Sequence, residues 1–152
     1  MTEYPEGIQR MLSDRRLDRV EANPDHARAV VTMAEQHLRT AAILIGTEDI
    51  AMAFTAAYDG ARKALTAVLA VEGLRVRPVG GAHRNTGMAV ALLLPGGAEG
   101  IAEFEWMRQV RNSTEYPDGK HPAATRQDVG EAISAGDTIV QLCTTYVRAR
   151  TG

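Results

Sequence analysis

Cysteine is nearly absent from the 152-residue chain, which contains only Cys143. A single cysteine excludes an intramolecular disulfide and any zinc or iron–sulfur site with several cysteine ligands. Aromatic residues are also scarce, at 5% of the chain, so the core must be built mainly from Ala, Val, Leu, Ile and Met. The low cysteine content fits a reducing compartment, and we expect a cytoplasmic protein.

Long apolar runs and an excess of positive charge are also lacking. The apolar run that ends at Leu94 is far too short to span a membrane, and residues 1–6 lack the basic start and apolar stretch of a signal peptide. We therefore expect a soluble domain with no membrane contact. The formal net charge of −2 argues against binding of nucleic acid by bulk positive charge, although it leaves room for a local basic patch.

Apolar residues recur every three or four positions along most of the chain, which indicates helices. The pattern predicts an all-α, antiparallel bundle of about five main helices, which form one domain over residues 23–152. We expect Asn23, Thr47 and Thr125 to cap three of these helices, and residues 74–81 to form a loop. The expected helices cover residues 24–45, 47–73, 83–94, 98–114 and the segment that begins at 125.

The N-terminal residues 6–22 are rich in charge and predict one further helix. Its apolar stripe of Ile8, Leu12 and Val20 is thin, and such a stripe buries little surface. We therefore expect residues 1–22 to form a mobile arm or a docking helix beside the bundle domain.

Several chemical signatures are missing. The four histidines lie in separate segments, without the i, i+4 pair of a helical metal site, and the HExxH pattern is absent. We predict no metal site and no cofactor. The glycine pairs at 80–81 and 96–97 do not follow a predicted strand and precede no Gly-Lys-Ser/Thr sequence, so they do not match a phosphate-binding loop. Cys143 lies on an apolar helix face and is interpreted as a core residue.

Arg111 is the first candidate functional residue. It follows Met107 by four residues and Phe104 by seven, so its side chain continues the apolar face of the predicted helix. A guanidinium on this face lies near the core or near an interface, where an unpaired charge is costly. The ordinary alternative is an ion pair with Glu115 one turn later.

The second candidate is the segment 80–85. Its glycines allow a tight entry into a helix, and His83 and Arg84 would lie beside the free backbone N–H groups of that helix, which is an arrangement suited to an anion. The alternative is an ordinary loop-to-helix junction with exposed polar residues. Residues 62–84 contain one acidic residue, Glu72, and a possible basic patch of Arg62, Lys63, Arg75, Arg77 and Arg84.

These two places, together with the Ala-rich helix predicted between Asp49 and Gly73, resemble the HEPN superfamily (higher eukaryote and prokaryote nucleotide-binding domain), and in particular its small stand-alone bacterial members. The similarity covers about residues 24–147. The resemblance implies a bundle of four main helices with additional short ones, usually in a symmetric dimer. The residues that carry it are 56–65 (AAYDGARKAL), 73–75 (GLR), 81–84 (GAHR), Arg111-Asn112 and 115–117 (EYP).

The resemblance also implies a site. In catalytic members, an Arg and the polar residue after it combine with a His about four to six residues beyond the Arg into a metal-independent ribonuclease site, in which the His transfers the proton of the 2′-hydroxyl. Here the Arg is Arg111 and the polar residue is Asn112. The positions expected for His contain Glu115, Tyr116 and Pro117, and a tyrosine with a pKa near 10 is a poor general base at neutral pH.

We therefore expect a HEPN-like domain that binds RNA or a nucleotide, in a toxin–antitoxin or stress-defence context, and that is non-catalytic or degenerate. Arg111, Asn112 and Tyr116 are the candidates for the cleft of a homodimer. The candidates for contacts with RNA or a nucleotide are His83, Arg84, Arg62 and Lys63.

Two alternatives stay open. One is a metal-independent RNA endonuclease that uses Arg111 with Tyr116, His83 or His121. The other is a protein–protein interaction module, which the weak N-terminal helix suggests. Its partner would be a nucleotidyltransferase-type protein, as in some HEPN pairs.

Overall fold

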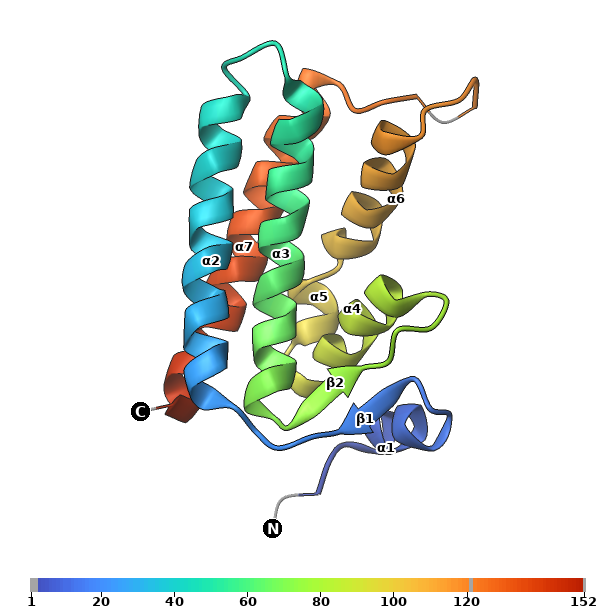
Figure 1. Cartoon of the computed structure of the whole chain (residues 1–152), viewed down its shortest axis with the longest axis vertical. Coiled ribbons are helices and arrows are strands. Elements are labelled where there is room, and N and C mark those ends of the chain that lie inside the picture. Colours follow the sequence, from blue (N-terminus) through green and yellow to red (C-terminus); the bar gives the residue numbers. More distant parts are fainter. Residues whose placement is uncertain (1–2, 121, 152) are drawn as a thin grey trace.

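The frame of the molecule consists of three long helices within residues 3–120 and 122–151, which the computed structural model describes. They are α2 (Pro24–Leu44), α3 (Ile50–Val71) and α7 (Arg126–Thr151). The three helices run side by side along the long axis of the molecule (Figure 1), and α3 packs against both of the others. The core therefore lies along α3.

Small residues allow α2 and α3 to approach each other closely. Ala34 and Ala41 of α2 and Ala57 and Ala61 of α3 are fully buried. A side-chain carbon at Gly60 would lie 3.0 Å from the Ala34 carbonyl oxygen, so only glycine fits there without a shift of the backbone. The Ala-rich sequence of this region thus sets the distance between the two helices.

The starts of the long helices show how local sequence sets their bounds. The Asn23 side chain caps α2 as predicted, and Thr125 and Asp128 exchange side chain-to-backbone hydrogen bonds of 2.9 and 3.1 Å at the start of α7. The prediction that Thr47 caps the next helix was wrong, because the side chain of Asp49 accepts the first-turn N–H of α3 instead. An aspartate adjacent to the first helical residue is the stronger cap.

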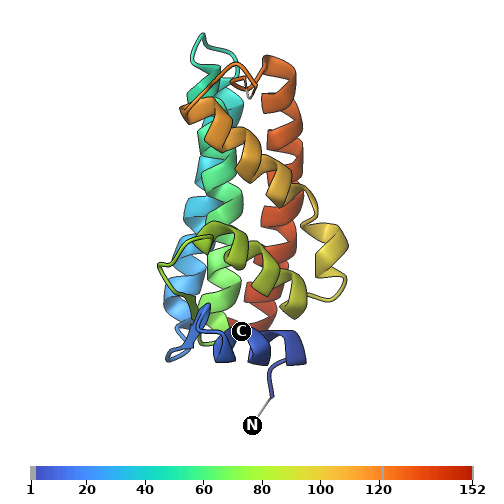
Figure 2. The ribbon, with the colours of Figure 1, turned by 90° about the vertical axis from the view of Figure 1, so that its right-hand side faces the viewer.

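A second layer of shorter helices covers one side of α3 and α7. It consists of α4 (Ala82–Leu93), the single turn α5 (Gly97–Gly100) and α6 (Glu103–Glu115). Figure 2 shows α4 and α6 crossing in front of the long helices. The predicted continuous helix over residues 98–114 was wrong, because the chain changes direction at Ile101, whose φ is −115° and whose side chain is buried.

The N-terminal segment also differs from its prediction. Helix α1 (Glu6–Ser13) ends well before residue 22, where Arg15 adopts a φ of +59° that interrupts the helix. The chain then forms β1 (Leu17–Arg19), which pairs antiparallel with β2 (Leu74–Val76). The prediction of a loop was therefore wrong for residues 74–76.

The buried residues of this segment differ from the apolar stripe that the sequence predicts. Ile8, Met11 and Leu17 are buried in the core, whereas Val20 is exposed. Residues 6–19 thus pack against the bundle through these three side chains.

The predicted fold class is confirmed. Within the described residues the main helices are α2, α3, α4, α6 and α7, and the remaining elements are short. No helix in residues 3–120 or 122–151 combines the length and the apolar content that crossing a bilayer requires.

Candidate functional site

Tyr58 lies at the centre of the contact between α3, α4 and α6. Its side chain is fully buried, and its hydroxyl is 2.9 Å from Nδ1 of His83 on α4. Its ring stacks on Phe104 of α6, with centroids 5.3 Å apart. The guanidinium carbon of Arg111, also on α6, lies 5.8 Å from the centre of the Tyr58 ring, within cation–π distance.

Two more arginines lie near the same phenol. Arg62 follows Tyr58 by one turn on α3, and Arg108 precedes Arg111 by one turn on α6; the positive charges of all three act on the Tyr58 hydroxyl. We refer to Tyr58, Arg62, His83, Arg108 and Arg111 as the Tyr58 cluster. It brings together side chains from three helices that lie far apart in the sequence.

The environment keeps both titratable rings of the cluster uncharged at neutral pH. Burial raises the pKa of Tyr58 to about 12, even though the nearby arginines oppose this shift. Burial, followed by the charges of Arg62 and Arg111, lowers the pKa of His83 from its ordinary value of 6.5. A neutral imidazole therefore lies against a protonated phenol.

The short contact between these rings favours one tautomer of His83. Nδ1 of His83 is the partner that the described residues provide for the buried Tyr58 hydroxyl. A buried O–H without an acceptor is costly, so the phenol donates to Nδ1. The neutral ring then carries its proton on Nε2, and His83 presents an N–H donor on its other side.

Arg111 forms the ion pair with Glu115 that the spacing predicts, with Nη2 to Oε1 at 2.9 Å. The side chain of Arg111 is 25% exposed and that of Glu115 is 34% exposed. The prediction that Arg111 continues the apolar face is also confirmed, since its guanidinium faces Tyr58. Its Nε is nevertheless buried without a hydrogen-bond partner in the described residues.

The other two arginines are paired unequally. Arg108 binds Glu105 through two hydrogen bonds of 3.0 and 2.6 Å. Arg62 has only Asp59 nearby, with 4.0 Å between Nη2 and Oδ1, and its Nε is buried without a partner within residues 3–120 and 122–151. Arg62 and Arg111 therefore each keep a buried Nε that no described group accepts from, whereas Arg108 is largely occupied by Glu105.

The structure separates the three residues predicted as catalytic. Arg111 faces inward, whereas Asn112 is exposed and Tyr116 is 78% exposed. Asn112 and Tyr116 line a shallow hollow on the outer side of α6, which Arg108 of the cluster also borders. His121, an alternative base, lies outside the described residues.

The four residues predicted to bind RNA or a nucleotide also lie in different parts of the structure. Arg62 and His83 meet in the Tyr58 cluster, but Arg84 is exposed and lines a different hollow, next to α6. The ammonium of Lys63 lies 2.6 Å from Nε2 of His37, so this side chain faces α2.

Tyr58 and Arg108 are the members of the cluster that the sequence analysis missed. A signal was present for each, because Tyr58 lies four residues before Arg62 and Arg108 lies three before Arg111. These spacings place each pair on one helix face. They say nothing about which face of another helix lies opposite.

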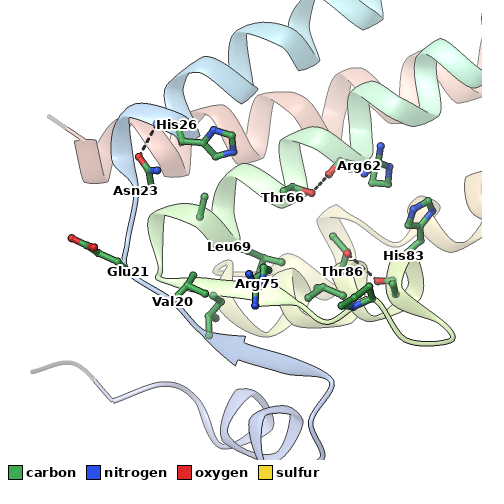
Figure 3. A pocket seen from close by; sticks show the side chains of 15 residues that line it. Val20, Glu21, Asn23, His26, Arg62, Thr66, Leu69, Arg75, His83 and Thr86 are labelled. Atoms are coloured by element: carbon green, nitrogen blue, oxygen red, sulfur yellow. Dashed lines mark hydrogen bonds between the residues drawn. The ribbon is translucent and has the colours of Figure 1, made fainter.

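A cavity of about 480 Å³ borders the cluster, between α3, β2 and the first turn of α4. Arg62 and His83 belong to its wall (Figure 3). In the described part of the chain, no group of three or more His, Cys, Asp or Glu side chains is positioned to hold a metal ion. The region thus offers hydrogen-bond donors, from Arg62 and His83, beside this cavity.

The fold and the site define an all-α bundle domain with an arginine–histidine cluster between its two helical layers. The HEPN domain family model matches residues 27–146, and the chain belongs to this family. Neither the curated proteins nor the solved structures include a match to the chain. HEPN domains are associated with functions that involve nucleotides or RNA.

Proposed function

We propose that the protein binds RNA or a nucleotide through phosphate contacts at the Tyr58 cluster and does not cleave it. The observation that carries this proposal is the position of Arg62 and Arg111, whose guanidinium groups lie around Tyr58 and whose side chains are 29% and 25% exposed. A guanidinium matches the geometry of a phosphate with paired N–H donors. His83, with its proton on Nε2, adds a neutral donor.

The same tautomer argues against cleavage. A general base that removes the proton of a 2′-hydroxyl needs a free acceptor nitrogen within reach of that proton. In His83 the acceptor Nδ1 is occupied by Tyr58, and Nε2 carries a proton. In addition, the positions that hold the histidine of catalytic members contain Glu115, Tyr116 and Pro117.

A metal-independent ribonuclease is the second candidate, and one observation favours it. Of the candidate bases within the described residues, Tyr116 is exposed on the outer side of α6, but His83 lies in the same cluster as Arg111. Its lowered pKa keeps the ring neutral, as a base requires. This function would require the opposite tautomer of His83.

Salt-dependent RNA binding tests the leading proposal. Each phosphate contact made by a single strand should contribute about 0.7 to the slope of log K against log salt, so Arg111→Gln and Arg62→Gln should each weaken binding and reduce the slope by about this amount. Arg10→Gln is the matched control, because Arg10 is an exposed helical arginine of α1 with an ion pair to Glu6. Wild-type affinity in both cluster variants would contradict the proposal.

Incubation with mixed RNA in EDTA separates binding from cleavage. We expect the RNA to stay intact with the wild-type protein and with Arg111→Ala. Cleavage by the wild type that disappears in Arg111→Ala would overturn the non-catalytic proposal in favour of the ribonuclease. A contaminating nuclease would cleave equally in both preparations.

We further propose that two copies form a homodimer through the outer side of α6. HEPN domains often dimerise, and Tyr116 offers an exposed aromatic ring beside the cluster. Light scattering at high concentration should give the mass of two copies, and Tyr116→Ser should shift the mass towards one copy. A wild-type mass of one copy would exclude this arrangement.

A further inference from the structure

We infer that the cavity beside the Tyr58 cluster holds an unstacked base of the bound RNA, next to the phosphate that Arg62 contacts. The inference rests on the proposed function and adds a base subsite to it. We call this space the α4 cavity; it lies between the segment before α2, the second half of α3, β2 and the first turn of α4. Its volume of about 480 Å³ falls within the usual range for small-ligand pockets.

The position of the α4 cavity links it to the phosphate site. Arg62 and His83 belong both to the Tyr58 cluster and to the cavity wall. Figure 3 shows these two side chains at one end of the cavity, with Asn23 and Glu21 at the opposite end. A nucleotide with its phosphate on Arg62 would therefore have its base directed along the cavity.

The lining has the composition that a base requires. Leu69, Leu74 and Val76 provide apolar surface, and the hydroxyls of Thr66 and Thr86 lie among them. Both hydroxyls donate to carbonyl oxygens of their own helices, at 3.0 Å in each case. Their oxygens keep lone pairs as acceptors, which the N–H edge of a base can use.

Planar side chains flank the apolar surface. His26, exposed at the start of α2, and Arg75 of β2 line the cavity from opposite sides (Figure 3). Arg75 is held at the rim by Asp18, with 3.3 Å between Nη2 and Oδ2. Imidazole rings and guanidinium planes are surfaces on which unpaired RNA bases stack.

The charges of the lining favour a ligand with phosphates. Arg62 and Arg75 are basic, and the acidic side chain of the lining, Glu21, is exposed at the far end and points away from the cavity in Figure 3. Because Arg75 is paired with Asp18, the lining suits a base with its phosphate at the Arg62 end of the cavity. A cation or a purely apolar ligand would leave the charge of Arg62 unused.

Two oligomers with the same backbone charge test the inference: a short oligouridylate and an abasic oligomer of equal length. Because stacking of one base contributes about 1–3 kcal/mol, we expect the wild type to bind the oligouridylate at least about fivefold more tightly than the abasic oligomer. Ala70→Leu, which fills the cavity from α3, should remove this preference and leave binding of the abasic oligomer unchanged.

Two further variants keep the test independent of folding. Ala51→Leu is the matched control, since Ala51 is exposed at the other end of α3, and it should bind both oligomers as the wild type does. His26→Ala changes an exposed residue that does not belong to the Tyr58 cluster, and it should reduce the preference for the oligouridylate. Thermal unfolding of each variant checks that the bundle is intact.

The outcomes distinguish the base subsite from the proposed function. If the wild type binds both oligomers equally, the base subsite is refuted while phosphate binding stands. A preference that survives in both Ala70→Leu and His26→Ala places the base elsewhere and also overturns the inference. If neither oligomer binds, the proposed function fails and the base subsite fails with it.

Discussion

Replacing Glu115 with glutamine should tighten the binding of RNA, because Glu115 competes with a phosphate for Arg111. The carboxylate lies 2.9 Å from the guanidinium, one helical turn away on α6. An RNA phosphate that binds Arg111 must displace this carboxylate or share the guanidinium with it. Glutamine keeps the size of the side chain and removes its charge.

The size of the effect follows from the exposure of the pair. Both side chains are partly exposed, at 25% for Arg111 and 34% for Glu115, so solvent screens the attraction. Helical i, i+4 pairs of this kind contribute about 0.3–0.5 kcal/mol. Release of the pair should therefore improve the dissociation constant by about twofold, since 1.4 kcal/mol corresponds to about tenfold, and should cost a similar small amount of folding stability.

Fluorescence titration of labelled RNA at low salt measures this difference. Glu6→Gln is the matched control, because Glu6 pairs with Arg10 at the same i, i+4 spacing on α1 and is far more exposed. The double variant Arg111→Gln with Glu115→Gln should bind like Arg111→Gln alone. The competition is refuted if Glu115→Gln changes the affinity no more than Glu6→Gln does.

Three further predictions concern stability. Tyr58→Phe removes the hydroxyl that donates to His83 and should lower the free energy of unfolding in urea by about 1 kcal/mol; an unchanged value would exclude that bond. Because the pKa of His83 is lowered in the folded protein, the unfolded chain binds more protons at mildly acidic pH. Stability should therefore be lost as the pH falls below the ordinary value of 6.5, and His83→Asn should reduce this loss, as urea titrations between about pH 8 and pH 5 can measure. Gly60→Ala would crowd Leu38 and should lower the free energy of unfolding by about 1–3 kcal/mol. Gly130→Ala lies in open space in α7 and should raise the free energy of unfolding by up to about 1 kcal/mol. Equal melting temperatures of the two variants would contradict the packing of α2 on α3.

The fold was predictable where its causes are local. The start of α2 depends on Asn23, which caps the first turn, and on Pro24, which suits the first helical position. These preferences act over a few residues and are visible in the sequence. Strand β1 was not predictable in this way, because Leu17 pairs with Val76 from a distant segment and only the folded chain brings the two together.

The candidate site was predictable along each helix but not between helices. The inward direction of Arg111 follows from its spacing after Phe104 and Met107, and the structure confirms it. Its neighbours Tyr58 and His83 come from α3 and α4. No periodicity relates these helices, because their contact depends on the packing of the second layer against the first.

The resemblance to catalytic members concerns the positions after Arg111, whereas the role of His83 depends on the packing of α4 against α3 and α6. A histidine is absent at the expected distance after Arg111, yet the fold brings His83 to the same phenol ring that Arg111 faces. What the imidazole can do there depends on a single buried hydroxyl, because Tyr58 occupies the acceptor nitrogen and leaves Nε2 protonated. A phenylalanine at this position would release Nδ1 and allow the other tautomer. The proposal of binding without cleavage therefore depends on Tyr58, which lies outside the Arg111-Asn112 pair and its expected histidine positions.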